Sequence, residues 1–132
     1  TGLHILIPII NLYTYEQTKS FAKITGRILN KLLPNKITTN WNTSLRKERV
    51  FYDYNQNAIG KTISSVFSAR PTDSATVSMP IDWKDLSHIL PTDFTILNVP
   101  QVLKRKNDPW EDISSHKQDL AKILDKVSNL NM

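Results

Sequence analysis

A change of hydrophobic period near residue 49 limits the folds that this chain can adopt. Over residues 14–34 apolar residues recur at helical spacing, and over residues 49–79 they form short runs of the kind found in β-strands. Helices and strands are mixed without the regular alternation of a parallel α/β fold. We therefore expect the α+β class, with a mixed or antiparallel sheet and flanking helices.

The helical part covers residues 14–34. Thr14, with Gln17 three positions later, matches a capping box at the start of a helix, and Pro34 ends the pattern. The apolar positions are Phe21, Ile24, Ile28 and Leu32, and the basic ones are Lys19, Lys23, Arg27 and Lys31. The pattern predicts an amphipathic helix. The polar residues 35–48 that follow predict a surface loop.

The strand-like segments are short. An apolar run over residues 3–10 predicts a buried strand, and the β-branched and aromatic residues at 49–54 predict another. Two further strands are predicted at residues 62–68 and 75–79. Turn-forming residues between 55 and 60 allow the strands 49–54 and 62–68 to pair as a hairpin.

The remaining elements lie toward the C-terminus. We expect a short helical stretch from Trp83, a brief extended piece at residues 94–97, and a helix at residues 99–106. A terminal helix is predicted from an apolar stripe made by Leu120, Ile123, Leu124, Val127 and Leu130.

Length and composition indicate one modest core. The 132 residues, 39% of them hydrophobic, fit a single domain. A core strand begins almost at the first residue, so we expect residues 1–132 to be a single partial domain, the C-terminal portion of a longer one. No stretch approaches the ~20 apolar residues of a membrane span. The chain has no cysteine, which excludes a disulfide scaffold and thiolate metal sites and agrees with an intracellular setting.

The charge balance favours anionic partners. Seventeen Lys and Arg residues against twelve Asp and Glu residues give a net charge of +5 and a pI near 9.5. Such a surplus is typical of proteins that bind nucleic acid or nucleotides. Many basic proteins bind neither, so the charge is only an indication.

Asp53 is the most unusual residue, because it stands within the apolar and aromatic strand 49–54. A buried carboxylate there needs a basic partner, a hydrogen-bond network or a metal ion. Strand alternation also allows Asp53 to lie on a solvent-facing side. The pattern alone leaves both interpretations open.

Three further residues are candidates for binding phosphate. His4 lies on the first predicted strand and is either a core histidine or a ligand for phosphate or metal. Lys61 follows Gly60 in a turn, where it contacts a phosphate or is simply exposed; the first glycine of a P-loop is missing. Arg70 ends a strand and either clamps a phosphate or pairs with an acid such as Asp53 or Asp73.

The three tryptophans are candidate stacking platforms for bases. Trp83 and Trp110 flank apolar helical stretches and are interpreted as core anchors. Trp41 lies in the polar loop, so it is the better candidate for a contact residue.

Taken in order, several segments resemble the polymerase domain of bacterial ligase D and its stand-alone archaeal relatives, within the archaeo-eukaryotic primase superfamily. The matching segments are Thr1-Gly2-Leu3-His4-Ile5, Arg49-Val50-Phe51-Tyr52-Asp53-Tyr54-Asn55-Gln56-Asn57, Gly60-Lys61-Thr62, Phe67-Ser68-Ala69-Arg70 and Ala75-Thr76-Val77-Ser78-Met79-Pro80-Ile81-Asp82-Trp83. Phe94-Thr95 and Asp108-Pro109-Trp110 continue the similarity, so it covers nearly the whole chain.

The resemblance implies a DNA-directed nucleotidyltransferase that fills gaps and extends ends during non-homologous end joining. It implies Mg or Mn as divalent cofactor, with DNA and nucleoside triphosphates as partners. End-joining proteins or a fused ligase domain are further expected partners, in a prokaryotic, nucleoid-associated setting and not at a membrane. In this scheme Asp53 is a catalytic metal ligand, and His4, Arg70 and Lys61 bind the nucleotide.

Two departures from the family pattern qualify this expectation. The upstream strand with an Asp-x-Asp pair is absent, and so is the serine that opens the motif containing His4. Several relatives carry a second arginine shortly after the one matched by Arg70, where this chain has Pro71 and Thr72. We therefore expect the chain alone to be inactive. The alternative is a non-catalytic nucleic-acid-binding module of the same fold.

Overall fold

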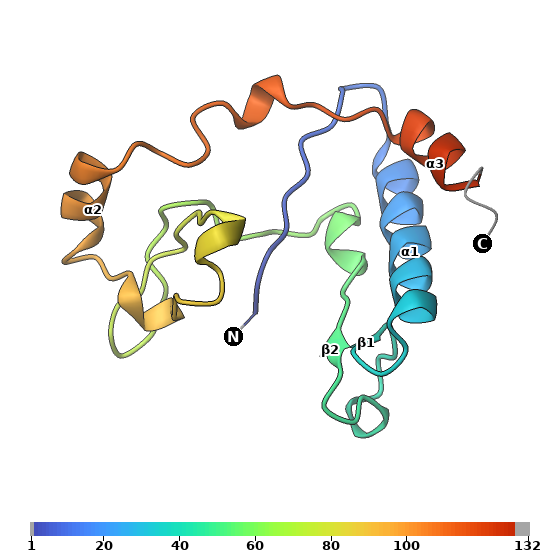
Figure 1. Ribbon diagram of the computed structural model, residues 1–132, viewed down its shortest axis with the longest axis horizontal. Helices are drawn as coiled ribbons and strands as arrows, with labels where there is room; N and C mark the ends of the chain where they lie inside the picture. The colour runs from blue at the N-terminus through green and yellow to red at the C-terminus, as the bar shows by residue number, and fades with distance from the viewer. Residues whose placement is uncertain (1, 129–132) are drawn as a thin grey trace. The chain divides into compact units, whose positions relative to one another are not determined.

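The computed structural model describes residues 2–128 and divides into two compact units, which are described separately. Unit 1 comprises residues Thr1–Ile10 and Ser64–Met132, and unit 2 comprises Asn11–Ile63. Both contain helices (Figure 1), and each has short β-pairings, a two-stranded sheet in unit 2 and isolated bridges in unit 1. The predicted α+β class is confirmed.

Unit 2 is built on the helix α1 (Tyr15–Leu32). Its N-terminus has the predicted capping box: the Gln17 backbone N–H donates to Thr14 Oγ1 at 3.2 Å, and the Thr14 N–H donates to Gln17 Oε1 at 2.8 Å. These two bonds satisfy backbone donors that a helix start otherwise leaves unpaired. The helix stops one residue before Leu33, whose N–H still bonds to Leu29. Pro34 follows and cannot extend the ladder.

The only named sheet of the described chain is a two-stranded parallel pair in unit 2. Strand β1 (Ile37–Thr38) pairs with β2 (Val50–Phe51). The Val50 N–H donates to Lys36 O, and the Tyr52 N–H donates to Thr38 O, both at 2.8 Å. Thr38 is only 3% exposed. The prediction that residues 35–48 form a surface loop is therefore wrong for β1.

The hairpin predicted between residues 49–54 and 62–68 is also wrong. The Val50 and Tyr52 N–H groups already donate to Lys36 O and Thr38 O, and residues Asn55–Asn57 form the 3-10 turn η2 instead of a tight hairpin turn. Gln56 Nε2 donates to Thr62 O at 2.6 Å, which closes residues 56–62 into a loop. The turn residues at 55–60 indicated that the chain reverses and pairs with β2 from the C-terminal side, but β2 pairs instead with β1, which lies earlier in the chain.

Unit 1 carries a small antiparallel arrangement in place of the predicted full strands. Bridges join Ala69 to Val77 and Thr76 to Thr95. A turn joins the first two of these segments, since the Ala75 N–H donates to Thr72 O at 2.8 Å. The brief extended piece expected at residues 94–97 is reduced to the bridge at Thr95.

The N-terminal run of unit 1 does not form the predicted buried strand. Leu3, Ile5, Leu6 and Ile7 are between 45% and 60% exposed. Among the described residues its ladder is limited to the parallel bridge between Ile9 and Gln118. A strand is buried only when neighbours cover it, and here the apolar residues lack such neighbours.

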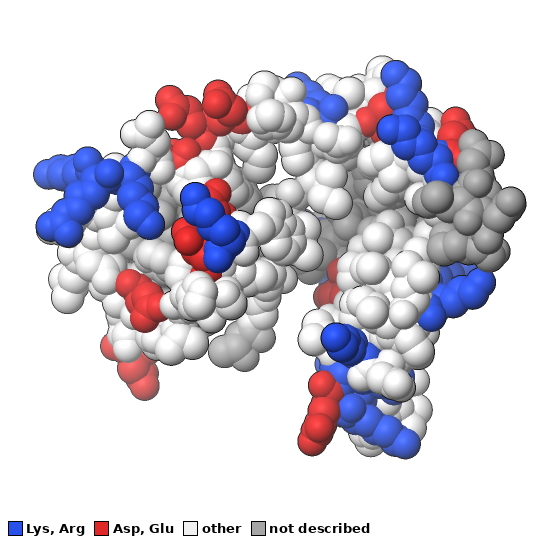
Figure 2. All heavy atoms as spheres, viewed as in Figure 1, with Lys and Arg blue, Asp and Glu red and all other residues white. Residues whose placement is uncertain are grey.

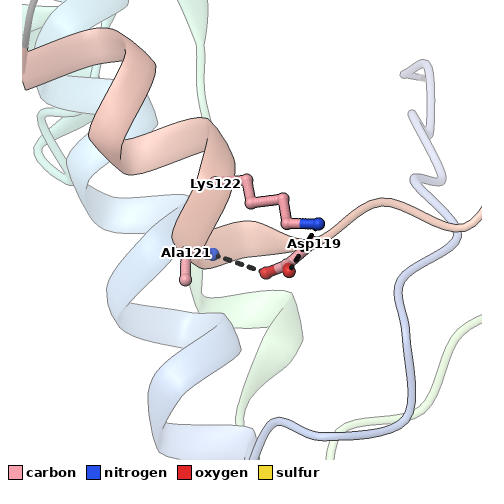
Figure 3. A network of polar contacts seen from close by, with 3 residues as sticks. All are labelled: Asp119, Ala121 and Lys122. Carbon is pink, nitrogen blue, oxygen red and sulfur yellow. Dashed lines mark hydrogen bonds and ion pairs between the residues drawn. The ribbon is translucent and has the colours of Figure 1, made fainter.

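Unit 1 also contains two helices that match prediction. α2 (Val99–Arg105) and α3 (Leu120–Ser128) place Val99 and Leu120 in the core. At the start of α3, Asp119 Oδ1 accepts the Ala121 N–H at 3.1 Å, and Asp119 Oδ2 lies 3.9 Å from Lys122 Nζ (Figure 3). Leu130, predicted on the same stripe, lies outside the described residues.

Short 3-10 turns complete the described chain: η1 (Thr43–Leu45) in unit 2, and η3 (Trp83–Asp85), η4 (Pro91–Asp93) and η5 (Ile113–Ser115) in unit 1. The helical stretch predicted from Trp83 is thus a single turn. Trp83 is 72% exposed, so its interpretation as a core anchor is wrong. None of the described helices is long and apolar enough to cross a membrane.

Candidate functional site

Asp53 lies two residues after the end of β2, and its side chain is exposed. Its Oδ1 accepts the Asn55 backbone N–H at 2.9 Å, which shapes the turn into η2. The structure therefore decides between the two interpretations of the sequence in favour of the solvent-facing one. The carboxylate is accessible to an external ligand, and the desolvation expected of a buried strand acid does not arise.

Gly26 and Tyr52 fix the approach of this segment to α1. A Cβ atom at Gly26 would lie 2.7 Å from Tyr52 Cδ1 and 3.1 Å from Thr39 Cγ2. The Tyr52 ring thus packs directly against the helix backbone, in space that any other residue at position 26 would occupy. Since Tyr52 precedes Asp53, this contact anchors the backbone that presents the carboxylate.

Partial burial changes the pKa of the Tyr52 phenol. Desolvation raises the pKa of the Tyr52 phenol above its usual value of 10.0, because the charged phenolate is disfavoured away from water.

This shift predicts a loss of stability at high pH. Above about pH 10 the unfolded state releases the Tyr52 proton while the folded state keeps it, so the free energy of unfolding falls as pH rises toward the folded pKa. Below pH 10 the contribution is fully present. Urea unfolding at about pH 8 and about pH 11 measures the loss. Tyr52→Phe should lose less stability across this interval, and equal losses in both proteins would contradict the prediction.

A row of aromatic rings and cations lies in the same unit, and we call it the aromatic cluster: Lys23, Trp41, Arg46, Phe51 and Tyr54. The Trp41 ring packs edge-on against Phe51, with centroids 4.8 Å apart, and against Tyr54 at 6.1 Å. Arg46 Cζ lies 3.8 Å from the Phe51 centroid, and Lys23 Nζ lies 6.0 Å from the Tyr54 centroid. The row therefore has a cation at each end.

Arginine side chains hold the loop that carries Trp41. Arg46 Nε donates to Asn40 O at 3.2 Å, and Arg46 Nη2 donates to Trp41 O at 3.1 Å. Arg49 donates to the carbonyls of Arg46, Leu45 and Pro34. These bonds link residues of the loop to one another and, through Pro34, to the chain just after α1, so Trp41 sits on a supported loop.

Lys61 is an exposed residue in a turn. Its backbone N–H donates to Ala58 O at 3.2 Å, and the preceding Gly60 has a φ of 76°, which glycine adopts without strain. Its side chain is available to solvent, as both interpretations of the sequence allowed.

His4 and Arg70 belong to unit 1, whereas Asp53 and Lys61 belong to unit 2. His4 is exposed on the extended N-terminal segment, so the core-histidine interpretation does not hold. Arg70 Nη1 donates to Ser64 Oγ rather than to Asp73. The Arg70 backbone N–H donates to Thr76 O at 2.7 Å, which fixes the residue at the end of its bridge. Both side chains are exposed. Arg70 offers the N–H donors of its guanidinium, and His4 offers a ring N–H.

The donor set for a metal ion is incomplete within the described residues. No group of three or more His, Cys, Asp or Glu side chains in residues 2–128 could hold a metal. Asp53 offers one carboxylate, and a divalent cation such as Mg²⁺ takes six oxygen ligands, several of them from water or substrate. The described chain alone therefore does not fit a two-metal centre.

Sequence reasoning missed Arg46, Lys23 and Gly26. A glycine inside a helix costs about 1 kcal/mol relative to alanine, so Gly26 within the helical pattern was a signal that another segment packs closely against the helix backbone there. Nothing in the residue pattern distinguished Arg46 or Lys23 from the other basic residues of the chain. Only the folded structure places Arg46 and Lys23 beside aromatic rings.

Comparison with known proteins identifies the family. The model of the LigD primase-polymerase domain matches residues 1–110. The chain belongs to the LigD primase-polymerase domain family. It is 31% identical over 130 residues to the bifunctional non-homologous end joining protein LigD of Bacillus subtilis, covering 96% of this chain and 21% of that protein. To the multifunctional LigD of Mycolicibacterium smegmatis it is 28% identical over 127 residues, 96% of this chain and 16% of the relative.

A solved structure shares the fold. The polymerase domain of Mycobacterium tuberculosis ligase D, in complex with DNA, superposes with a TM-score of 0.69 at 25% identity, covering 80% of this chain and 37% of that one. The resemblance to the ligase D polymerase domain is thus confirmed. This LigD primase-polymerase chain spans about a fifth of the length of the Bacillus relative.

Proposed function

We propose that this chain is part of a DNA-directed nucleotidyltransferase that fills gaps and extends ends in double-strand break repair. The observation that carries the proposal is the family match over residues 1–110, which includes every candidate site residue. The relatives are end-joining proteins by name, and the similar polymerase domain binds DNA. A fused ligase domain or separate end-joining proteins are the partners that this activity calls for.

The proposed roles follow from side-chain chemistry. Asp53 supplies one oxygen ligand to a divalent cation, Mg²⁺ or Mn²⁺, and its accessible carboxylate supports this role. Arg70 and Lys61 are exposed cations suited to the triphosphate of an incoming nucleotide, Arg70 by two parallel hydrogen bonds and Lys61 as a point charge. His4 is an exposed ring N–H donor suited to a nucleotide phosphate.

The incomplete donor set leads to a distinct expectation for the isolated chain. With one carboxylate in place of several, the chain alone should not add nucleotides to a primer, even with Mn²⁺ present. Primer extension on a gapped DNA substrate measures this. Robust extension by the isolated 132-residue chain would contradict the idea that it carries only part of the site.

A chimera tests the activity itself. In it, this chain replaces the aligned 130-residue region of Bacillus subtilis LigD, with which it is 31% identical. We expect metal-dependent primer extension by the chimera. A chimera that folds and binds DNA but never extends a primer would favour the alternative, a binding module without chemistry.

A further inference from the structure

The aromatic cluster presents one large ring to solvent. Trp41 is 48% exposed although it contacts both Phe51 and Tyr54. Those contacts are edge-on, with interplanar angles of 74° and 82°. In each contact the edge of one ring meets the face of the other, and the part of Trp41 that remains exposed is the surface on which a further planar group can pack.

The loop that carries Trp41 is pre-organised. Arg46 bonds to the carbonyls of Asn40 and Trp41 while its guanidinium lies over Phe51. Within the loop, Asn42 Oδ1 accepts the Ser44 N–H at 3.0 Å and caps the turn η1. A ring held in this way loses little freedom when a ligand stacks on it, so more of the interaction energy appears as affinity.

Charge is distributed unequally between the two units. Unit 2 contains nine Lys and Arg residues and three Asp and Glu residues, which gives it a formal charge of +6. Unit 1 contains eight Lys and Arg residues and nine Asp and Glu residues, which gives −1. The whole basic surplus of the chain therefore lies in unit 2. Figure 2 shows blue side chains at the end of unit 2 that holds β1 and β2.

We propose that the aromatic cluster binds single-stranded DNA, with a base stacked on Trp41 and phosphates near Arg46 and Lys23. Stacking on an aromatic platform within a basic surface tolerates any base, because every base has a π-face. The choice of DNA rests on the proposed function. The position of the site rests on the contacts and charges of unit 2.

The geometry favours a strand over a free nucleotide. The two cations lie at opposite ends of the row, one over Phe51 and one over Tyr54, with Trp41 between these rings. A polymer places phosphates on both sides of a stacked base, whereas a free nucleotide carries all of its phosphates on one side. A cation beyond each of the two rings beside Trp41 therefore suits the phosphates that precede and follow a stacked base.

Binding of a fluorescent oligothymidine of about ten nucleotides to the full 132-residue chain tests the proposal. Trp41→Ala should weaken binding roughly 5- to 150-fold at low salt, the range for losing one stacked base. Trp41→Phe, which keeps a ring, should retain most of the affinity. Trp83→Ala is the matched control, because Trp83 is an exposed tryptophan in the acidic unit. It should change affinity less than about two-fold.

Salt dependence adds a second readout. Arg46→Gln and Lys23→Gln should each lower the slope of log affinity against log salt by about 0.7, the value for one phosphate contact with a single strand. An unchanged slope in both variants would overturn the roles of these cations.

A third measurement leaves Trp41 in place and does not depend on the fold of the Trp41 variant. In the double variant Trp83→Phe/Trp110→Phe, Trp41 is the sole tryptophan, and its fluorescence should be quenched by the oligonucleotide. Equal quenching by free dTTP would overturn the choice of a strand. Binding of the oligonucleotide that neither quenches Trp41 fluorescence nor weakens in Trp41→Ala would overturn this site. In that case, primer extension by the chimera with Bacillus subtilis LigD would show that the proposed function still stands.

Discussion

Replacing Asp53 by Asn is expected to lower primer extension by the chimera roughly 100- to 1,000-fold while DNA affinity changes less than about two-fold. A metal-bound carboxylate contributes several kcal/mol to the stabilisation of charge in the transition state, and the amide of asparagine is a much weaker ligand. The backbone bond from Asn55 to Asp53 Oδ1 should survive, because the asparagine side chain keeps an acceptor oxygen. The substitution therefore removes charge with little change in local structure.

Asp73→Asn is the matched control for this prediction. Asp73 is an exposed acid in the turn between the bridged segments of unit 1, and its replacement removes the same charge. We expect it to leave extension within about two-fold of the unsubstituted chimera. Extension by Asp53→Asn at the level of this control would rule out Asp53 as a metal ligand and favour the non-catalytic alternative.

Replacing Gly26 by Val is expected to lower the free energy of unfolding by about 2–3 kcal/mol. A Cβ atom at this position already lies 2.7 Å from Tyr52 Cδ1 and 3.0 Å from Tyr52 Cε1, and valine adds two more carbon atoms. The Tyr52 ring must then move away from α1, and the packing between Tyr52 and the helix backbone at position 26 is lost. Urea unfolding followed by circular dichroism measures the effect.

Two variants separate the clash from helix propensity. Ser20→Val places the same side chain at an exposed position of α1 and should change stability by less than about 0.5 kcal/mol. Combining Gly26→Ala with Tyr52→Ala should cost less than the sum of the single changes, since the second removes the atoms that the first would meet. A Gly26→Val protein as stable as the unsubstituted chain would show that Tyr52 does not pack on the helix backbone.

Local signals in the sequence were sufficient for the helices. The capping box at Thr14 and the proline at position 34 bounded α1, and an apolar stripe located α3. Helical hydrogen bonds connect residues four apart, so the information that specifies a helix lies within a short stretch of sequence. Ordered short motifs likewise indicated the family that the comparisons confirmed.

Strand pairing depended on segments far apart in the chain. The partner of β2 is residues Ile37–Thr38, in a stretch whose composition indicated only a loop, and the N-terminal apolar run has a single bridge at Ile9. A strand's hydrogen bonds are made to another segment, so its own residues specify a tendency to extend but not a partner.

By itself, the sequence determined the α+β class, the helices, the family and the identity of the candidate residues Asp53, His4, Lys61 and Arg70. Only the tertiary structure decided that Asp53 is exposed, that Gly26 admits Tyr52, and that Arg46 and Lys23 flank a row of rings around Trp41. Exposure and side-chain contact depend on which distant segments pack together, and no local pattern carries that information.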